Sequence, residues 1–185
     1  MTELVFFLEE PSAQAMLEGL LPRLLPEDVV FRCIPFEGKQ DLERQLVRRL
    51  RGYRNPDARF VVIRDQDSNP DCTVVKAQIV NLCKEAGKPD ALVRIACREL
   101  ESFYLADLAA VERGIGIVGI ARLQAKVKYR SPDYLGSPSK ELSTLTRGRY
   151  QKVGGSRAIG AHLDLNNQRS DSFKNLVSGI RRLIA

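Results

Sequence analysis

The stretch Leu4-Val5-Phe6-Phe7-Leu8-Glu9-Glu10-Pro11 decides the fold class. Five consecutive apolar residues, ended by two acids and a proline, are typical of a strand that is buried on both faces. Strands of this kind belong mainly to parallel sheets, which helices cover on both sides. The stretch therefore predicts a domain of the α/β class.

Three further apolar runs follow, and the intervals between them each leave room for a helix. We expect strands at 29–34, 60–63 and 91–97, and helices at 15–25, 42–50, 74–82 and 99–108. This alternation predicts a largely parallel sheet of about four strands flanked by helices. Beyond residue 113 the pattern is mainly helical, which suggests an α/β core at 1–113 and a helical basic extension at 114–185, packed on the same domain.

Charge is distributed unevenly along the chain. The net charge is +6, but residues 1–100 hold 15 basic and 16 acidic side chains, whereas residues 101–185 hold 14 and 7. A basic excess of this kind favours a nucleic-acid partner, because several cations together are needed to neutralise a phosphate backbone. The candidates for nucleic-acid binding are Lys39, Lys76, Lys126, Lys128, Arg130, Arg147, Arg149 and Lys152.

The composition excludes several classes of protein. No apolar run approaches the roughly 20 residues of a membrane span, and no signal peptide is evident, so we expect a cytoplasmic protein without a membrane partner. The four cysteines form no C-x-x-C pair, and His162 is the only histidine. Zinc ribbons and multi-histidine metal centres are therefore excluded. Any metal would have oxygen ligands, which favours Mg²⁺ or Mn²⁺.

Acidic residues follow the first and third expected strands. Glu9 and Glu10 end the first, and Asp65 and Asp67 end the third. Ligands collect at the carboxyl edge of a parallel sheet, and these two strands can be neighbours at its switch point. Carboxylates in one cleft repel one another unless a cation lies among them. The pattern predicts a metal site, whereas the alternative interpretation is that these acids cap helices.

Two more acids, Glu99 and Glu101, follow the fourth expected strand. On a helix they would lie about 200° apart, so at most one of them faces the cleft. We predict that Glu99 is the catalytic residue of this pair.

Longer stretches carry a resemblance to a known family. They are Phe-Leu-Glu-Glu-Pro-Ser at 7–12, Glu-Gly-Lys-Gln-Asp-Leu at 37–42, Arg-Asp-Gln-Asp-Ser at 64–68, Arg-Ile-Ala-Cys-Arg-Glu-Leu-Glu-Ser-Phe-Tyr-Leu-Ala-Asp at 94–107, Pro-Ser-Lys-Glu-Leu at 138–142 and Asn-x-Arg-Ser-x-Ser-Phe at 167–173. The chain resembles the Toprim (topoisomerase–primase) domain, and looks closer still to a Toprim-like bacterial family of unknown function. That family is similar to nuclease-type Toprim domains that accompany ATPases in some bacterial phage-defence systems.

The resemblance implies a Rossmann-like Toprim fold with a site for Mg²⁺ or Mn²⁺. It implies that Asp65 and Asp67 are metal ligands, and that Glu9 is a ligand or general acid/base. Many Toprim domains place a glycine directly after the first glutamate, whereas Glu10 follows here, so Glu9 and Glu10 stay alternatives as the metal-facing acid.

The sequence is compatible with three functions. The first is a metal-dependent nuclease-like domain that cleaves phosphodiesters in DNA or RNA. The second is a non-catalytic sensor or effector subunit that binds a partner ATPase. A nucleotide-binding α/β domain ranks last, because no glycine-rich loop follows the first strand.

Overall fold

A four-stranded, all-parallel sheet forms the centre of the structure, a computed structural model that describes residues 2–185. Its strand order is β2-β1-β3-β4, with β1 at Thr2–Leu8, β2 at Val29–Pro35, β3 at Arg59–Asp65 and β4 at Leu92–Ala96. The predicted α/β class and parallel sheet are confirmed. Because β1 pairs with both β2 and β3, the direction of winding switches between β1 and β3.

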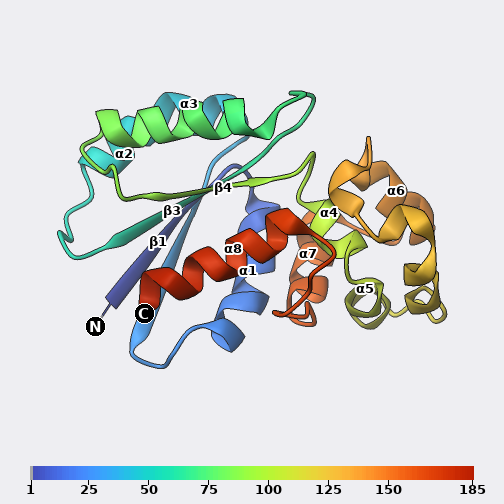
Figure 1. Ribbon diagram of the computed structural model, residues 1–185. Coiled ribbons are helices and arrows are strands. Elements are labelled where there is room, and N and C mark those ends of the chain that lie inside the picture. Colours follow the sequence, from blue (N-terminus) through green and yellow to red (C-terminus); the bar gives the residue numbers. More distant parts are fainter. Residues whose placement is uncertain (1) are drawn as a thin grey trace.

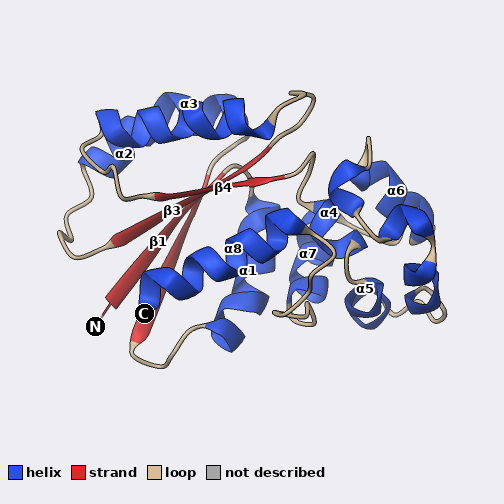
Figure 2. Cartoon of the chain, viewed as in Figure 1, coloured by secondary structure: helices blue, strands red, loops and turns tan. Residues whose placement is uncertain are grey.

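Helices cover both faces of the sheet (Figure 2). Helices α2 and α3 lie on one face, α1 and α8 lie on the other, and α4 to α7 gather beyond the carboxyl ends of the strands (Figure 1). The bounds are α1 Pro11–Leu24, α2 Lys39–Arg51, α3 Cys72–Glu85, α4 Glu101–Leu105, α5 Leu108–Ile115, α6 Pro138–Leu145, α7 Lys152–Gly160 and α8 Asp171–Ile184, with 3-10 turns at Ala121–Ala125, Val127–Tyr129 and Pro132–Tyr134. No helix among residues 2–185 is long and apolar enough to cross a membrane.

Strand β1 separates two hydrophobic cores. Leu4, Phe6 and Leu8 point into the core shared with α1, α4, α5, α7 and α8, whereas Val5 and Phe7 point toward α2 and α3. Successive side chains of a strand face opposite sides of the sheet, so an all-apolar strand is required when both sides are covered. This explains the uninterrupted apolar run of β1.

The helix expected over residues 99–108 is divided into two, α4 and α5. The break falls at Asp107, whose carboxylate accepts hydrogen bonds from the amides of Ala110 (3.1 Å) and Asp164 (2.7 Å). Asp107 therefore caps the N-terminus of α5 and ties it to the segment after α7. The long-range contact with Asp164 was not visible in the local sequence pattern.

The C-terminal third packs directly on the α/β core. Helix α7 lies against α1 so closely that a Cβ atom on Gly19 would be 2.6 Å from the amide nitrogen of Ala161, and one on Gly160 would overlap the backbone of Met16. Helix α8 packs on β4. The glycine pair lets the α1 and α7 backbones meet, and this contact brings the beginning of α7 to the carboxyl edge of the sheet.

Candidate functional site at the carboxyl edge of the sheet

The ends of β1 and β3 bring Glu9 and Asp65 together. The amide of Glu9 donates to the carbonyl oxygen of Ile63 (3.2 Å), which extends the pairing of the two strands by one residue. The Glu9 carboxylate then accepts a hydrogen bond from the amide of Asp65 (2.9 Å). These two acids thus lie side by side at the switch point, where parallel sheets bind their ligands.

A third carboxylate, Glu101 at the start of α4, completes the buried part of the site. Glu9 and Glu101 are 7% and 2% exposed. Burial raises the pKa of Glu9 and of Glu101, and it raises the pKa of Asp65 well above its usual range, with the charges of Glu9 and Glu101 adding to the effect. These three acids repel one another and hold protons more strongly than free carboxyls do.

Two lysines border this group, and each pairs with a further acid. Lys39, at the first position of α2, pairs with Asp67 at 2.9 Å, and Lys152, at the first position of α7, pairs with Glu10. Partial burial lowers the pKa of Lys152, but the ion pair with Glu10 and the nearby acids outweigh this and raise it. We call Glu9, Glu10, Asp65, Asp67 and Glu101 the acidic cluster.

Asp65 and Asp67 do not share one environment, although the sequence predicted that both belong to one metal site. The strand ends at Asp65, and Asp67 adopts a left-handed backbone with φ of 56°. Its amide donates to the carbonyl oxygen of Arg98 at 2.7 Å. This turn directs Asp67 to Lys39, while Asp65 stays beside Glu9 and Glu101.

Glu99 lies outside the buried group and has a structural partner. Its carboxylate accepts a hydrogen bond from the amide of Ser139 (2.7 Å), near the beginning of α6. Glu101 instead accepts from the hydroxyl of Tyr150 at 2.9 Å. Of the two acids that follow β4, Glu101 is therefore the one that lies beside Asp65.

Tyrosines close the buried side of the acidic cluster. The Tyr104 side chain is fully buried, and its hydroxyl group has no hydrogen-bond partner among the described residues. Burial raises the pKa of Tyr104 well above its usual range; the nearby Ser156 hydroxyl opposes this, and the charges of Glu101 and Asp65 add to it. A buried hydroxyl without a partner is costly, so this position is suited to a water molecule or another polar ligand.

A small cavity opens between the acids. It is lined by Glu9, Glu10, Ser12, Ala13, Ile63, Asp65 and Leu100. The space open to the centre of a water-sized sphere is about 10 Å³, which is near the minimum for one water molecule. A species no larger than a water or a metal ion fits there.

The carboxylates of the acidic cluster are suitable ligands for a divalent cation such as Mg²⁺, but the structure does not hold them in the geometry of a metal site. Five carboxylates face only two paired lysines, and carboxylate oxygens are the preferred ligands of Mg²⁺ and Mn²⁺. Within residues 2–185, no group of three or more His, Cys, Asp or Glu side chains already has the arrangement of a metal site. Glu9 and Asp65 both line the small cavity and would be the ligands of a cation there.

Only two of the expected nucleic-acid-binding residues, Lys39 and Lys152, form ion pairs with the acidic cluster. Lys128 pairs with Glu141 at 2.6 Å, and Lys76 lines a separate groove between α3 and α8. The remaining candidates are exposed on the C-terminal third, namely Lys126, Arg130, Arg147 and Arg149.

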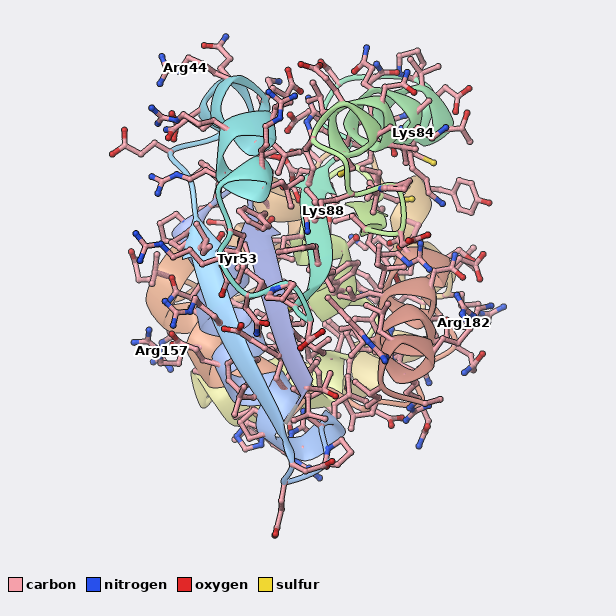
Figure 3. All side chains as sticks on the ribbon, turned by 90° about the vertical axis from the view of Figure 1, so that its left-hand side faces the viewer. Arg44, Tyr53, Lys84, Lys88, Arg157 and Arg182 are labelled. Atoms are coloured by element: carbon pink, nitrogen blue, oxygen red, sulfur yellow. The ribbon has the colours of Figure 1, made fainter. Side chains whose placement is uncertain are left out.

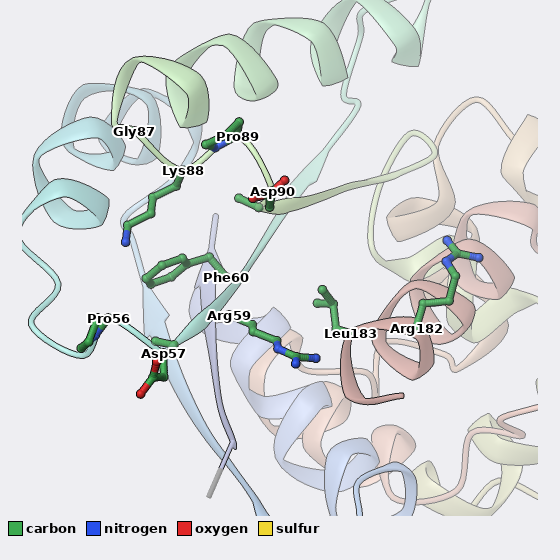
Figure 4. Close-up of a pocket in the computed structure, with 12 residues that line it drawn as sticks. Pro56, Asp57, Arg59, Phe60, Gly87, Lys88, Pro89, Asp90, Arg182 and Leu183 are labelled. Carbon is green, nitrogen blue, oxygen red and sulfur yellow. The ribbon is translucent and has the colours of Figure 1, made fainter.

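A larger pocket, of about 490 Å³, lies at the opposite, amino edge of the sheet (Figure 4). Its cations are Arg59, Lys88 and Arg182, and its acids are Asp57 and Asp90. The Lys88 ammonium lies 5.1 Å from the centre of the Phe60 ring. A pocket in which cations and acids are mixed in this way does not indicate a particular reaction. The acidic cluster is therefore the better candidate for a catalytic site.

The sequence did not single out Tyr104, and it preferred Glu99 to Glu101. The helix expected from residue 99 begins only at Glu101, so Glu99 lies in the loop before α4. Tyr150 reaches Glu101 because its ring packs over Gly155, where an added Cβ atom would be 2.5 Å from the ring. This is a contact between residues 49 positions apart.

Fold and site together define a Rossmann-like α/β domain with an acidic cluster at its switch point. The chain belongs to the family described as a domain of unknown function (DUF4276), which matches residues 8–181. The match includes all of the acidic cluster and nearly all of the C-terminal third. Neither a curated protein nor a solved structure matches the chain.

Proposed function

We propose that this chain is a metal-dependent, nuclease-like domain of Toprim type that hydrolyses phosphodiesters of DNA or RNA at the acidic cluster. The observation that carries the proposal is the convergence of Glu9, Asp65 and Glu101 at the switch point, where Glu9 and Glu101 are buried, Asp65 is half-buried, and burial raises the pKa of all three. Structural caps do not require three neighbouring carboxylates with raised pKa values. The resemblance of the surrounding stretches to Toprim domains supports the same activity.

The side chains have distinct roles in this proposal. Mg²⁺ or Mn²⁺, when bound, supplies positive charge that polarises a phosphodiester and activates water. Glu9 and Asp65 hold the cation, with Asp67 as a further ligand. Glu101 accepts or donates the proton, because a carboxyl with a raised pKa exchanges protons closer to neutral pH.

Lys39 and Lys152 exchange partners during substrate binding. In the structure they neutralise Asp67 and Glu10. Once a cation neutralises the acids, both ammonium groups are free to pair with phosphate oxygens. This places a positive charge on each side of the buried carboxylates, where a phosphodiester would lie.

The test combines cleavage and metal binding. Purified protein is incubated with DNA and RNA in the presence of Mg²⁺ or Mn²⁺, and thermal unfolding is followed with and without Mn²⁺. We expect Asp65→Asn to abolish cleavage and the stabilisation by Mn²⁺. Asp90→Asn, which changes an exposed acid at the amino edge, should retain both. Cleavage by a correctly folded variant that carries Asp65→Asn and Asp67→Asn would contradict the proposal.

One observation favours the second candidate, a non-catalytic subunit of a partner ATPase. The two lysines already neutralise Glu10 and Asp67, and residues 2–185 contain no preassembled metal site. A protein of this kind would show no hydrolysis and no stabilisation by Mn²⁺. It would instead form a stable complex when co-expressed with a neighbouring ATPase.

A further inference from the structure

Helix α2 carries a row of arginines on its outer face. Arg44, Arg48 and Arg51 follow one another at helical spacing and are exposed, on the side opposite the buried leucines. Figure 3 shows this side of the molecule, with Arg44 at the outer surface of α2 and the edge strand β2 beside it. The near-neutral charge of residues 1–100 hides this local excess of positive charge.

A groove separates α2 from β2. It has a volume of about 530 Å³ and is lined by Arg32, Cys33, Ile34, Pro35, Arg48, Arg49, Gly52 and Tyr53. Three of its side chains are therefore arginines, and none is acidic. We call Arg32, Arg44, Arg48, Arg49 and Arg51 the arginine track.

The track retains positive charge that its neighbours do not neutralise. Arg44 pairs with Asp41 at 2.7 Å, and Arg32 lies 3.6 Å from Glu3. Arg48 donates only to the neutral amide of Gln45, at 3.1 Å. Arg49 is exposed, and its side chain forms no hydrogen bond or ion pair with residues 2–185. Arg48 and Arg49 thus present guanidinium groups without an ion pair to the groove, whereas Arg51 donates to the carbonyl oxygen of Glu85 at 2.8 Å.

Helix α2, which carries four of the five track residues, begins at the acidic cluster. Lys39, the first residue of α2, pairs with Asp67, and the helix then runs about 18 Å toward the amino edge of the sheet. Residues one helical turn apart repeat every 5–6 Å along this line. A row of forked cations with a regular repeat suits an anion that also repeats, which is what a phosphate backbone provides.

We propose that the arginine track binds the phosphate backbone of a nucleic-acid strand and leads it to the acidic cluster. The second half of this proposal rests on the proposed function, whereas binding by the track does not. Arg48 and Arg49 contact phosphates in the groove, and Lys39 contacts the phosphate nearest the acids. The exposed cations of the C-terminal third are not required for this contact.

Binding can be measured without catalysis. Fluorescence anisotropy with a labelled single-stranded oligonucleotide, in EDTA and over a range of salt concentrations, gives the affinity and its salt dependence. The test variant carries Arg48→Gln and Arg49→Gln. The control carries Arg181→Gln and Arg182→Gln on α8, which removes the same charge from a distant exposed surface.

We expect the α2 variant to bind roughly tenfold or more weakly, since each charge-assisted hydrogen bond contributes strongly to an interface. The slope of log affinity against log salt should become shallower by about 1.4, because each lost contact to single-stranded nucleic acid removes about 0.7. The α8 control should change both quantities much less. Circular dichroism and thermal unfolding verify that both variants fold.

Three results would overturn the proposal. The first is unchanged binding by the folded α2 variant, and the second is an equal loss in the α8 control. The third is selective binding of an acidic polyglutamate peptide in place of the oligonucleotide, which would assign the track to a protein partner. If the α2 variant loses binding while the wild-type protein cleaves nothing, the track stands and the proposed nuclease activity fails.

Discussion

Asp65 and Asp67 are two residues apart, yet they belong to two different sides of the carboxyl edge. On the buried side, Asp65 lies beside Glu9 and Glu101 with no ion pair among the described residues. On the open side, Asp67 pairs with Lys39, whose side chain is 44% exposed. The buried side thus accumulates repulsion that a cation would relieve, whereas the open side is already neutralised and faces solvent.

The difference between the two sides indicates a division of labour. Unpaired buried carboxylates are characteristic of sites where protons or cations are handled. An exposed lysine that leads into a row of arginines is suited to contact with phosphate. The same short segment, Asp65 to Asp67, therefore connects proposed chemistry with proposed substrate binding.

The largest expected effect comes from separating α7 from α1. Gly160→Ala should lower the free energy of unfolding by about 1–3 kcal/mol, because the added methyl group overlaps the backbone of Met16. It should also displace Lys152 from Glu10, because Lys152 is the first residue of α7. Urea denaturation measures the loss. Gly154→Ala is the control in the same helix, because an added Cβ atom there meets nothing within 4 Å. Equal stability of the two variants would show that the contact between α1 and α7 is looser than described.

An intermediate effect is expected from Asp65→Asn. The pKa of Asp65 is higher in the folded than in the unfolded chain, so the folded state binds more protons between these two values. The free energy of unfolding therefore falls as pH rises through that interval. Without metal, Asp65→Asn should stabilise the protein above the interval by on the order of 1 kcal/mol, and the two proteins should converge below the unfolded pKa.

Thermal unfolding from pH 3 to pH 9 would test this, with Asp67→Asn as the matched variant. Asp67→Asn loses only its partly exposed pair with Lys39, so it should lower the free energy of unfolding by less than about 1 kcal/mol. If Asp65→Asn were destabilising at high pH, the Asp65 carboxylate would have a compensating partner, and the contrast between the two sides would disappear.

The smallest effect is expected from Lys39→Gln. An exposed ion pair contributes about 0–1 kcal/mol, and salt screens it, so the loss of stability should vanish at high ionic strength. Lys76→Gln is the control, because Lys76 is exposed and has no ion pair with residues 2–185. A large loss of stability in Lys39→Gln that persists at high salt would show that the ion pair between Lys39 and Asp67 is shielded from solvent, like the acids of the buried side.

Much of the fold was predictable from the sequence. The runs at 4–8 and 60–63 identified two central strands because burial on both faces leaves no room for polar residues. Their neighbouring positions in the sheet, expected from the switch-point rule, are confirmed by the pairing of β1 with β3. Glu9 and Asp65 were found for the same reason, since residues that follow neighbouring parallel strands reach the same edge.

Other features were not encoded in any local pattern. Glu99 was preferred to Glu101, but the helix expected from residue 99 begins only at Glu101, and Glu99 lies in the loop before it. The turn at Asp67 depends on its bond to Arg98 from the loop after β4. Tyr104 had no signal of its own, because burial of a hydroxyl group depends on the elements packed around it.

The strands, their parallel pairing and the acids at their ends follow from local sequence patterns, because apolar periodicity and turn residues act over a few positions. The packing of distant elements selects which acids lie together at the carboxyl edge, and which lysine pairs with Glu10 and which with Asp67. Those choices depend on α4 and α7 docking onto the sheet, through contacts such as Gly160 with Met16 that join residues far apart in the chain. Electrostatic energy depends on distance and burial, and neither quantity exists until these elements have packed.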